Sequence, residues 1–195
     1  MKKIILASGS PRRRELLTQI GISFEVVKAE GEEKITTDDP EEAVKELAMQ
    51  KAQEVAGRVD ADVVIGADTV VAVDGEIMGK PKDPEDAVRM IHRILGRDHE
   101  VLTGVAVILK KGEVETTINF AETTRVHVFP MTEEEIQAYV ASKEPLDKAG
   151  AYGIQGLFAA YVSGIEGDYN NVVGLPVGRL YQEVKAIADV DLRTL

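Results

Sequence analysis

The stretch from Glu100 to Phe129 constrains the fold more than any other part of the chain. β-Branched residues dominate it, and a Lys110-Lys111-Gly112 turn divides it into two long runs, such as 101–109 and 114–129. Such residues favour extended backbone, and two runs around a glycine-containing turn are typical of an antiparallel hairpin. We therefore expect a long antiparallel hairpin in the middle of the chain.

Helix signals alternate with shorter strand signals ahead of this hairpin. Three helices are expected where a capping residue precedes proline: Ser10-Pro11, Asp39-Pro40 and Asp83-Pro84. Further elements are expected as follows: a strand over 2–7, a β segment over 62–67 and 69–73 turned by Asp74-Gly75, a helix capped by Thr132 with Glu135, a turn-rich stretch over 145–174, and a helix opened by Pro176. This order predicts an α/β fold with a mixed sheet.

The composition limits the class of protein. Of the 195 residues, 44% are hydrophobic, which suffices for one globular domain over residues 1–195 with room for two lobes. The absence of cysteine excludes disulfide scaffolds and thiol enzymes, and it makes the cytoplasm the default compartment. The net charge of −11 argues against direct nucleic-acid binding, because affinity for a phosphate backbone comes from a basic face.

Two apolar runs resemble targeting segments but are too short. The run after Lys3 holds four apolar residues, whereas a secretory signal needs roughly 7 to 15. The uncharged run over 149–165 is shorter than the roughly 20 residues that span a bilayer, and glycines interrupt it. We therefore expect neither a secretory signal nor a membrane partner.

The junction between the first strand and the first helix is a candidate phosphate site. Ser8, Gly9 and Ser10 lead into the helix, whose free N–H groups attract anions, and Arg12 and Arg13 follow at once. Their guanidinium groups can bind phosphate oxygens in pairs. The alternative is a solvated arginine run after an ordinary serine cap.

Charged residues occupy two positions where burial is expected. Asp68 interrupts an apolar strand, where a carboxylate is costly unless it is paired or bound to a metal. Lys51 falls on the helix face that should be buried, so it either extends to the edge or serves a site. Lys80 adds positive charge after the hairpin turn. Glu30, Glu32 and Glu33 form an acidic loop that is ordinarily solvated surface, and one of them could share a divalent cation with Asp68.

A glycine-rich segment over 147–156 is the remaining candidate. Its glycines allow a ligand to approach the backbone, and Gln155 offers the donor and acceptor that a base edge requires. The alternative is a tight turn that packs a glycine-rich strand. His92, His99 and His127 show neither metal-site spacing nor a recognisable acidic partner, and we interpret them as structural.

Taken together, the motifs resemble the Maf family of nucleoside triphosphate pyrophosphatases. They span nearly the whole chain in order: Leu6-Ala-Ser-Gly-Ser-Pro-Arg-Arg13, Gly66-Ala-Asp-Thr-Val-Val71, Gly79-Lys-Pro81, Lys148-Ala-Gly-Ala-Tyr-Gly-Ile-Gln-Gly156 and Val172-Val-Gly-Leu-Pro176. The resemblance implies an elongated, twisted mixed sheet flanked by helices. It also implies two lobes with a central nucleotide cleft, similar to the inosine triphosphate pyrophosphatases.

The resemblance further implies hydrolysis of a nucleoside triphosphate to the monophosphate and pyrophosphate. Arg12, Thr69 and Gln155 match the branch that acts on dTTP and UTP. The alternative is a nucleotide-binding regulator of cell division and septum formation, because the family also carries a proposed link to septum formation. A broader house-cleaning hydrolase that acts on modified pyrimidine nucleotides is a further alternative. A homodimer is the default expectation for such an enzyme.

The roles expected from this resemblance divide the residues into three groups. Asp68, Lys51 and Lys80 are the expected catalytic residues, with Asp68 either a general base or a metal ligand. Glu33 is expected as a second ligand of Mg²⁺ or Mn²⁺. The expected substrate-binding residues are Ser8, Arg12 and Arg13 for the triphosphate, with Thr69 and Gln155 for the pyrimidine.

Overall fold

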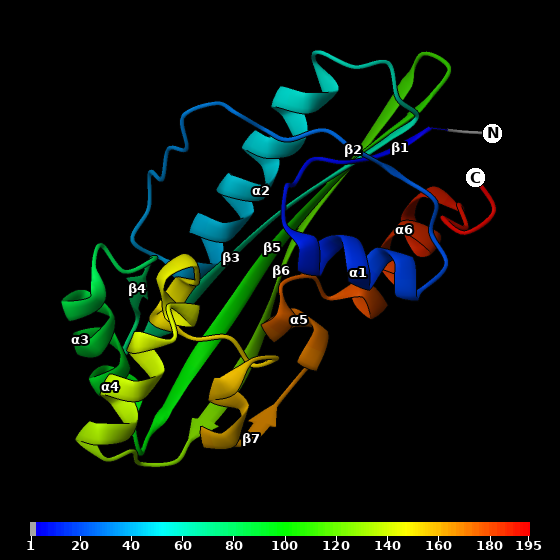
Figure 1. The fold of residues 1–195 in the computed structure, drawn as a ribbon. Coiled ribbons are helices and arrows are strands. Elements are labelled where there is room, and N and C mark those ends of the chain that lie inside the picture. The colour runs from blue at the N-terminus through cyan, green and yellow to red at the C-terminus, as the bar shows by residue number, and fades with distance from the viewer. Residues whose placement is uncertain (1–2) are drawn as a thin grey trace.

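A computed structural model describes residues 3–195 and shows a mixed β-sheet with helices on both faces (Figure 1). The strand order among these residues is β2-β1-β3-β5-β6-β7, and β4 pairs with β3 beside this path. β1 runs parallel to β2 and β3, whereas the remaining pairs are antiparallel. The strands are β1 (Ile4–Leu6), β2 (Glu25–Val26), β3 (Val63–Val73), β4 (Glu76–Met78), β5 (Asp98–Lys111), β6 (Val114–Val128) and β7 (Val162–Glu166).

The predicted mixed sheet and the central hairpin are therefore confirmed. β5 and β6 form the hairpin, and the turn at Asp74-Gly75 joins β3 to β4 with both residues at positive φ. Two glycine-favouring conformations in succession match the right-handed twist of a tight hairpin. The strand predicted over 2–7 includes Lys2, which lies outside the described residues.

The helices begin at the expected caps. They are α1 (Pro11–Gln19), α2 (Pro40–Ala56), α3 (Pro84–Ile94), α4 (Glu133–Ala141), α5 (Tyr169–Val173) and α6 (Val177–Ala188). The side chains of Asp39, Asp83 and Thr132 accept hydrogen bonds from the first turns of α2, α3 and α4. Ser10 differs, because its side chain makes no cap hydrogen bond to α1.

Different helices cover the two faces of the sheet. α2 packs on one face, and α1, α3, α4 and α6 contribute to the larger core on the other (Figure 1). The apolar core on the α2 face is divided in two. One part includes Val64 of β3, and the other includes Val70 of the same strand. Asp68 points to this face between them, because side chains alternate along a strand.

Two glycines bring α2 close to the sheet. A Cβ atom on Gly66 would lie 2.8 Å from the backbone nitrogen of Ala52, and one on Gly104 would lie 2.8 Å from that of Lys45. Such separations are too short for carbon, so only glycine permits this approach. The close packing places the side chains of α2 against the middle of β3.

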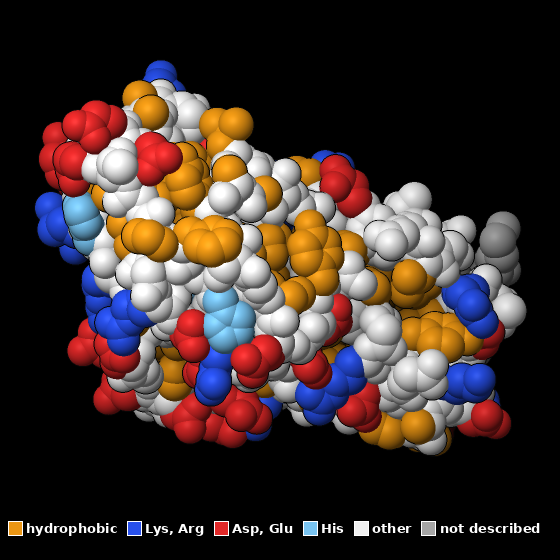
Figure 2. Space-filling view, turned by 90° about the horizontal axis from the view of Figure 1, so that it is seen from below, with side chains coloured by type: hydrophobic (Ala, Val, Ile, Leu, Met, Phe, Trp, Pro, Cys, Tyr) orange, Lys and Arg blue, Asp and Glu red, His pale blue; other side chains and the backbone are white. Residues whose placement is uncertain are grey.

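The stretch over 145–174 contains more regular structure than predicted. It includes β7, α5 and three 3₁₀ turns, namely Glu144–Asp147, Ala149–Ala151 and Leu157–Tyr161. β7 is half-buried without strict alternation, so its sequence lacks the periodicity that predicts a strand. Seen from below, the molecule shows hydrophobic side chains across the middle of one face and charged side chains along its margins (Figure 2). None of the helices formed by residues 3–195 has the length and apolar character needed to cross a bilayer.

Candidate active site

The middle of β3 has an open edge. One edge of the strand pairs with β5 over residues 63–72. On the other edge, β1 pairs with residues 63–65 and β4 with residues 71–73, so residues 66–70 have no partner strand there. Asp68 and Thr69 lie at the centre of this opening and are the two residues of β3 that are not buried. The opening is therefore where β3 can meet a ligand.

Lys51 joins two carboxylates at this opening. Its ammonium group on α2 donates to Oδ1 of Asp68, and it lies 2.9 Å from Oε1 of Glu33. Only 16% of the Lys51 side chain and 16% of the Asp68 side chain are exposed. Lys51 therefore does not extend into solvent, and the partner of the partly buried Asp68 charge is an ammonium group. The structure brings together Asp68, Lys51 and Glu33, three of the predicted site residues.

Arg13 organises the opposite side of β3. Its guanidinium group donates to Oγ of Ser8 at 3.1 Å, to Oγ1 of Thr69 at 3.0 Å and to the carbonyl oxygen of Gly174 at 2.8 Å. Burial lowers the pKa of Arg13, while the negative charge of nearby Asp68 opposes this shift. The side chain thus fixes α1 to β3 and to the end of α5. It also presents positive charge close to Asp68.

Thr69 belongs to a buried polar network. Besides accepting from Arg13, its hydroxyl lies 2.9 Å from that of Thr103 on β5, which in turn donates to the carbonyl oxygen of Asn171. The Asn171 amide donates to the carbonyl oxygen of Val101 and is itself fully buried. Sequence reasoning missed Thr103 and Asn171. A threonine in a strand is ordinary, and nothing local distinguishes a network asparagine from a turn residue.

The glycine-rich segment, residues 148–156, lies beside the loop that carries Lys80. The amide of Gly150 donates to the carbonyl oxygen of Gly79 at 3.0 Å, next to the exposed Lys80. Gln155 is also exposed, and its amide makes no hydrogen bond to the described residues. No hydrogen bond or ion pair within residues 3–195 links Lys80 or Gln155 to Asp68. They stay candidates from the sequence.

Arg12 and Lys148 also lie in this region. The pKa of Asp147 lies below its ordinary value, first because Lys148 donates to it and further because the charge of Arg12 is nearby. The Lys148 ammonium lies 2.7 Å from Oδ1 of Asp147 and is largely buried. Lys148 belongs to one of the sequence motifs, but no local feature of the sequence indicates its role. Arg12 and Asp147 are far apart in the sequence, so only the folded structure shows that they are close.

Metal binding at the opening would depend on few protein ligands. Within the described residues, no group of three or more histidine or acidic side chains could hold a metal ion. The two predicted ligands, Asp68 and Glu33, both contact the Lys51 ammonium.

The prediction that the histidines lack acidic partners is wrong for two of them. Nε2 of His92 lies 3.2 Å from a carboxylate oxygen of Glu133. His127 lies between Asp98, at 2.6 Å, and Glu166, at 3.1 Å. These partners lie far away in the sequence, so spacing could not reveal them.

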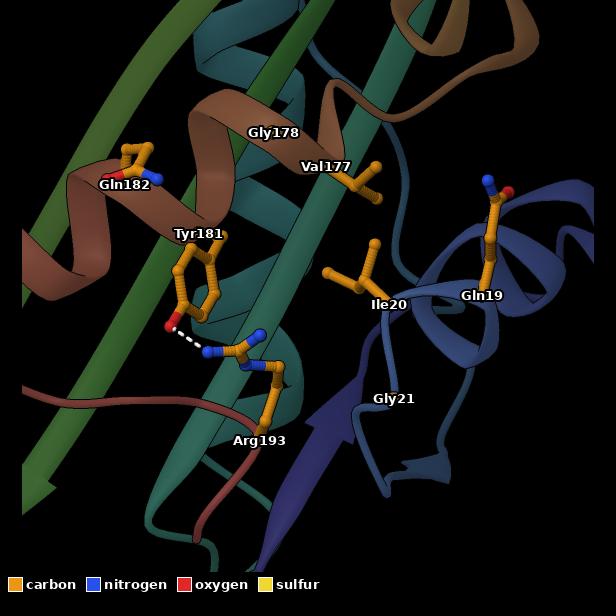
Figure 3. A pocket seen from close by; sticks show the side chains of 8 residues that line it. All are labelled: Gln19, Ile20, Gly21, Val177, Gly178, Tyr181, Gln182 and Arg193. Atoms are coloured by element: carbon orange, nitrogen blue, oxygen red, sulfur yellow. Dashed lines mark hydrogen bonds between the residues drawn. The ribbon is translucent and has the colours of Figure 1, made fainter.

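A separate hollow of about 520 Å³ lies at the far end of α1 (Figure 3). The end of α1, the start of α6 and Arg193 line it, and Arg193 donates to the Tyr181 hydroxyl at 2.6 Å. None of the predicted site residues lines this hollow, so it is not part of the opening at β3.

Comparison with known proteins connects the chain to one family. Three relatives, each named dTTP/UTP pyrophosphatase, come from Agathobacter rectalis, Lachnoclostridium phytofermentans and Bacillus cytotoxicus. They are 52%, 51% and 52% identical; the matches cover 96%, 95% and 95% of this chain and 98%, 95% and 95% of theirs. Among solved structures, the Ham1 protein of Staphylococcus aureus is similar, with a TM-score of 0.48 and 18% identity over 65% of this chain and 72% of its own. The model of the family described as Maf-like protein matches residues 3–187, and the chain therefore belongs to the Maf family, as its motifs predict.

Proposed function

We propose that this protein hydrolyses dTTP and UTP to the nucleoside monophosphate and pyrophosphate. The observation that carries the proposal is the cluster of Arg13, Lys51 and Asp68 at the open edge of β3. It combines cations that suit a triphosphate with a carboxylate that can accept a proton. The relatives named dTTP/UTP pyrophosphatase support this assignment, since they match this chain over nearly its full length.

The chemistry assigned to these residues is water attack on the α-phosphorus. Asp68 takes a proton from the attacking water, and the new P–O bond forms as the bond to the bridging oxygen breaks. Pyrophosphate leaves with the electron pair of that bond. Arg13 and Lys51 stabilise the negative charge on the phosphoryl oxygens, and Lys80 and Arg12 supply further positive charge.

Mg²⁺ or Mn²⁺ fits this site when a triphosphate is bound. Mg²⁺ is usually held by one or two carboxylates together with substrate phosphates, and Asp68 and Glu33 are two carboxylates that meet at Lys51. With Asp68 as a ligand in place of its role as base, these two residues would hold the ion, which would neutralise phosphate charge. The protein itself has a net charge of −11, so phosphate binding needs such local compensation.

Gln155 is proposed to recognise the pyrimidine. Its exposed amide can both donate and accept, and a thymine or uracil edge presents carbonyl oxygens on either side of an N–H group. Thr69 is proposed to recognise the pyrimidine together with Gln155, and its hydroxyl also accepts from Arg13 and faces Thr103. Ser8 holds the same guanidinium group from the other side.

Product analysis tests this proposal. Purified protein is incubated with dTTP, UTP, CTP, ATP and GTP, with and without Mg²⁺, alongside Asp68→Asn. We expect monophosphate and pyrophosphate from dTTP and UTP, and loss of both products in Asp68→Asn. Turnover of purine nucleotides instead would keep the chemistry and overturn the role of Gln155. Nucleotide binding without hydrolysis would favour a regulator of cell division.

We propose that residues 1–195 act as one bilobed catalytic unit, and that modified pyrimidine triphosphates are among its substrates. The homodimer and the cytoplasmic location stay predictions from the sequence.

A further inference from the structure

The glycine-rich segment, residues 148–156, adopts a backbone that needs external support. Gly150 and Ala151 both have positive φ, at 69° and 60°. This left-handed region suits glycine, but for alanine it is unfavourable and persists only where the surroundings impose it. Ala151 is fully buried, and the residue that follows it, Tyr152, places a large aromatic side chain in the same core. Tyr152 is therefore well placed to hold this backbone conformation.

Tyr152 is held by a histidine from the central sheet. Its hydroxyl lies 2.6 Å from Nε2 of His99 on β5, and the two rings meet edge to face with centroids 5.2 Å apart. His99 is 3% exposed and Tyr152 is 5% exposed. Tyr152 also packs on Phe158, with ring centroids 4.7 Å apart. A buried hydrogen bond thus joins the segment to a rigid strand.

The direction of this hydrogen bond follows from counting donors. Burial lowers the pKa of His99 to about 4, so the imidazole is neutral near pH 7 and carries one proton. Nδ1 of His99 has no partner among the described residues. If Tyr152 donates to Nε2, only the Nδ1–H group is left unpaired. If Nε2 donates instead, both the tyrosine proton and the Nδ1 lone pair are left unpaired, which costs more.

The free amide of Gln155 lies between two attachments of the segment. On one side is the Tyr152–His99 bond. On the other, the Glu144 carboxylate accepts from the amide of Leu157 at 3.0 Å and from the hydroxyl of Tyr139 at 3.1 Å. Gln155 itself makes no hydrogen bond to the described residues. Its position is thus set by its neighbours rather than by its own side chain.

We propose that His99 and Tyr152 are positioning residues that fix the glycine-rich segment and thereby place the Gln155 amide for contact with the pyrimidine base. This inference rests on the proposed function. It adds two residues that act on substrate binding without touching the substrate. Because Arg13, Lys51 and Asp68 lie on α1, α2 and β3, outside this segment, we expect the pair to affect substrate binding more than turnover.

The test compares Tyr152→Phe with the matched control Tyr161→Phe. Both changes remove a hydroxyl from the same aromatic cluster, because Tyr161 also packs on Phe158, but only Tyr152 bonds to His99. We expect KM for dTTP and UTP to rise about fivefold in Tyr152→Phe with kcat nearly unchanged, and the control to behave as wild type. His99→Gln, which keeps an acceptor near Nε2, should retain most of the affinity, whereas His99→Leu should not.

A double-variant cycle shows whether the pair acts through Gln155. In a Gln155→Ala background, Tyr152→Phe should raise KM no further, because the group that it positions is gone. An equal additional rise in that background would overturn the proposal. Unchanged KM in Tyr152→Phe, with lower stability alone, would also overturn it and leave a packing role.

Hydrogen exchange separates this inference from the proposed function. If wild-type protein hydrolyses neither dTTP nor UTP, the proposed function fails, and the positioning pair is judged on the amides of residues 153–156. Faster exchange of these amides in Tyr152→Phe but not in Tyr161→Phe would support the pair. Equal exchange in both variants would refute it.

Discussion

Replacing Gly104 by alanine tests whether the close packing of α2 on the sheet sets the distance between Lys51 and Asp68. Gly104 lies on β5 directly opposite Asp68 of β3. A Cβ atom there would lie 2.8 Å from the backbone nitrogen of Lys45 and still closer to the carbonyl group of Val44. Backbone atoms cannot rotate away as a side chain can, so α2 must move off the sheet.

The size of the effect follows from this contact. Overpacking of this kind costs about 1–3 kcal/mol of unfolding free energy. Because α2 carries Lys51, the same movement separates its ammonium from Asp68. A displacement of about 1 Å at a reacting centre can lower the rate about 100-fold, so we expect kcat/KM to fall at least tenfold.

Urea unfolding and steady-state kinetics with dTTP measure the two effects. Gly178→Ala is the matched control, since Gly178 lies on α6 and a Cβ atom there meets nothing within 4 Å. The control should keep wild-type activity, with stability unchanged or slightly raised. Wild-type stability and activity in Gly104→Ala would refute the reasoning that glycine is required for α2 to approach.

Three further predictions concern single groups at and around the site. Arg13→Lys should lose about 1–2 kcal/mol in urea unfolding and most of its activity, because lysine cannot reach Ser8, Thr69 and Gly174 at once; wild-type values would contradict the bridging role. Burial lowers the pKa of His99 to about 4; the charge of Asp98 opposes this shift, His127 adds to it, and the ring otherwise faces Tyr152. Below pH 6.5 the unfolded chain therefore binds a proton that the folded protein does not. The free energy of unfolding thus decreases as the pH is lowered. Between pH 7.5 and pH 5 wild type should lose about 2 kcal/mol more than His99→Gln, and parallel losses in urea titrations would count against this. EDTA should abolish hydrolysis and leave the urea midpoint unchanged, since no three acidic or histidine side chains among the described residues form a metal cage; a lowered midpoint would indicate a resident ion.

Local patterns were sufficient to predict most of the elements. The caps at Asp39, Asp83 and Thr132 act within one helical turn, so sequence shows them directly. The hairpin of β5 and β6 is also local. Asp68 could be identified as unusual because a charge in an apolar strand is costly wherever the strand lies.

The contacts that assemble the site depend on distant residues and could not be predicted in the same way. The carbonyl group that accepts from Arg13 belongs to Gly174, 161 positions away. Lys51 reaches Asp68 because Gly66 and Gly104 admit α2, and neither glycine differs locally from one in a turn. His99 and Tyr152 are separated by 53 positions, and neither shows a local signal for its partner. Such pairings are fixed by tertiary packing.

The open edge of β3 also separates two tasks in a single strand. Successive side chains point to opposite faces, so Asp68 meets α2 while Thr69 meets the Arg13 network. If a partner strand covered this edge, its backbone would separate Asp68 from Thr69. Because the edge is open, one ligand can contact both residues. Substitutions around α2 can therefore change the reactivity of the Asp68 carboxylate with little effect on substrate binding. Substitutions around α5 can change substrate binding through Arg13 with little effect on that carboxylate. The gap in pairing along β3 thus allows two adjacent residues to be tuned separately, one from each face of the sheet.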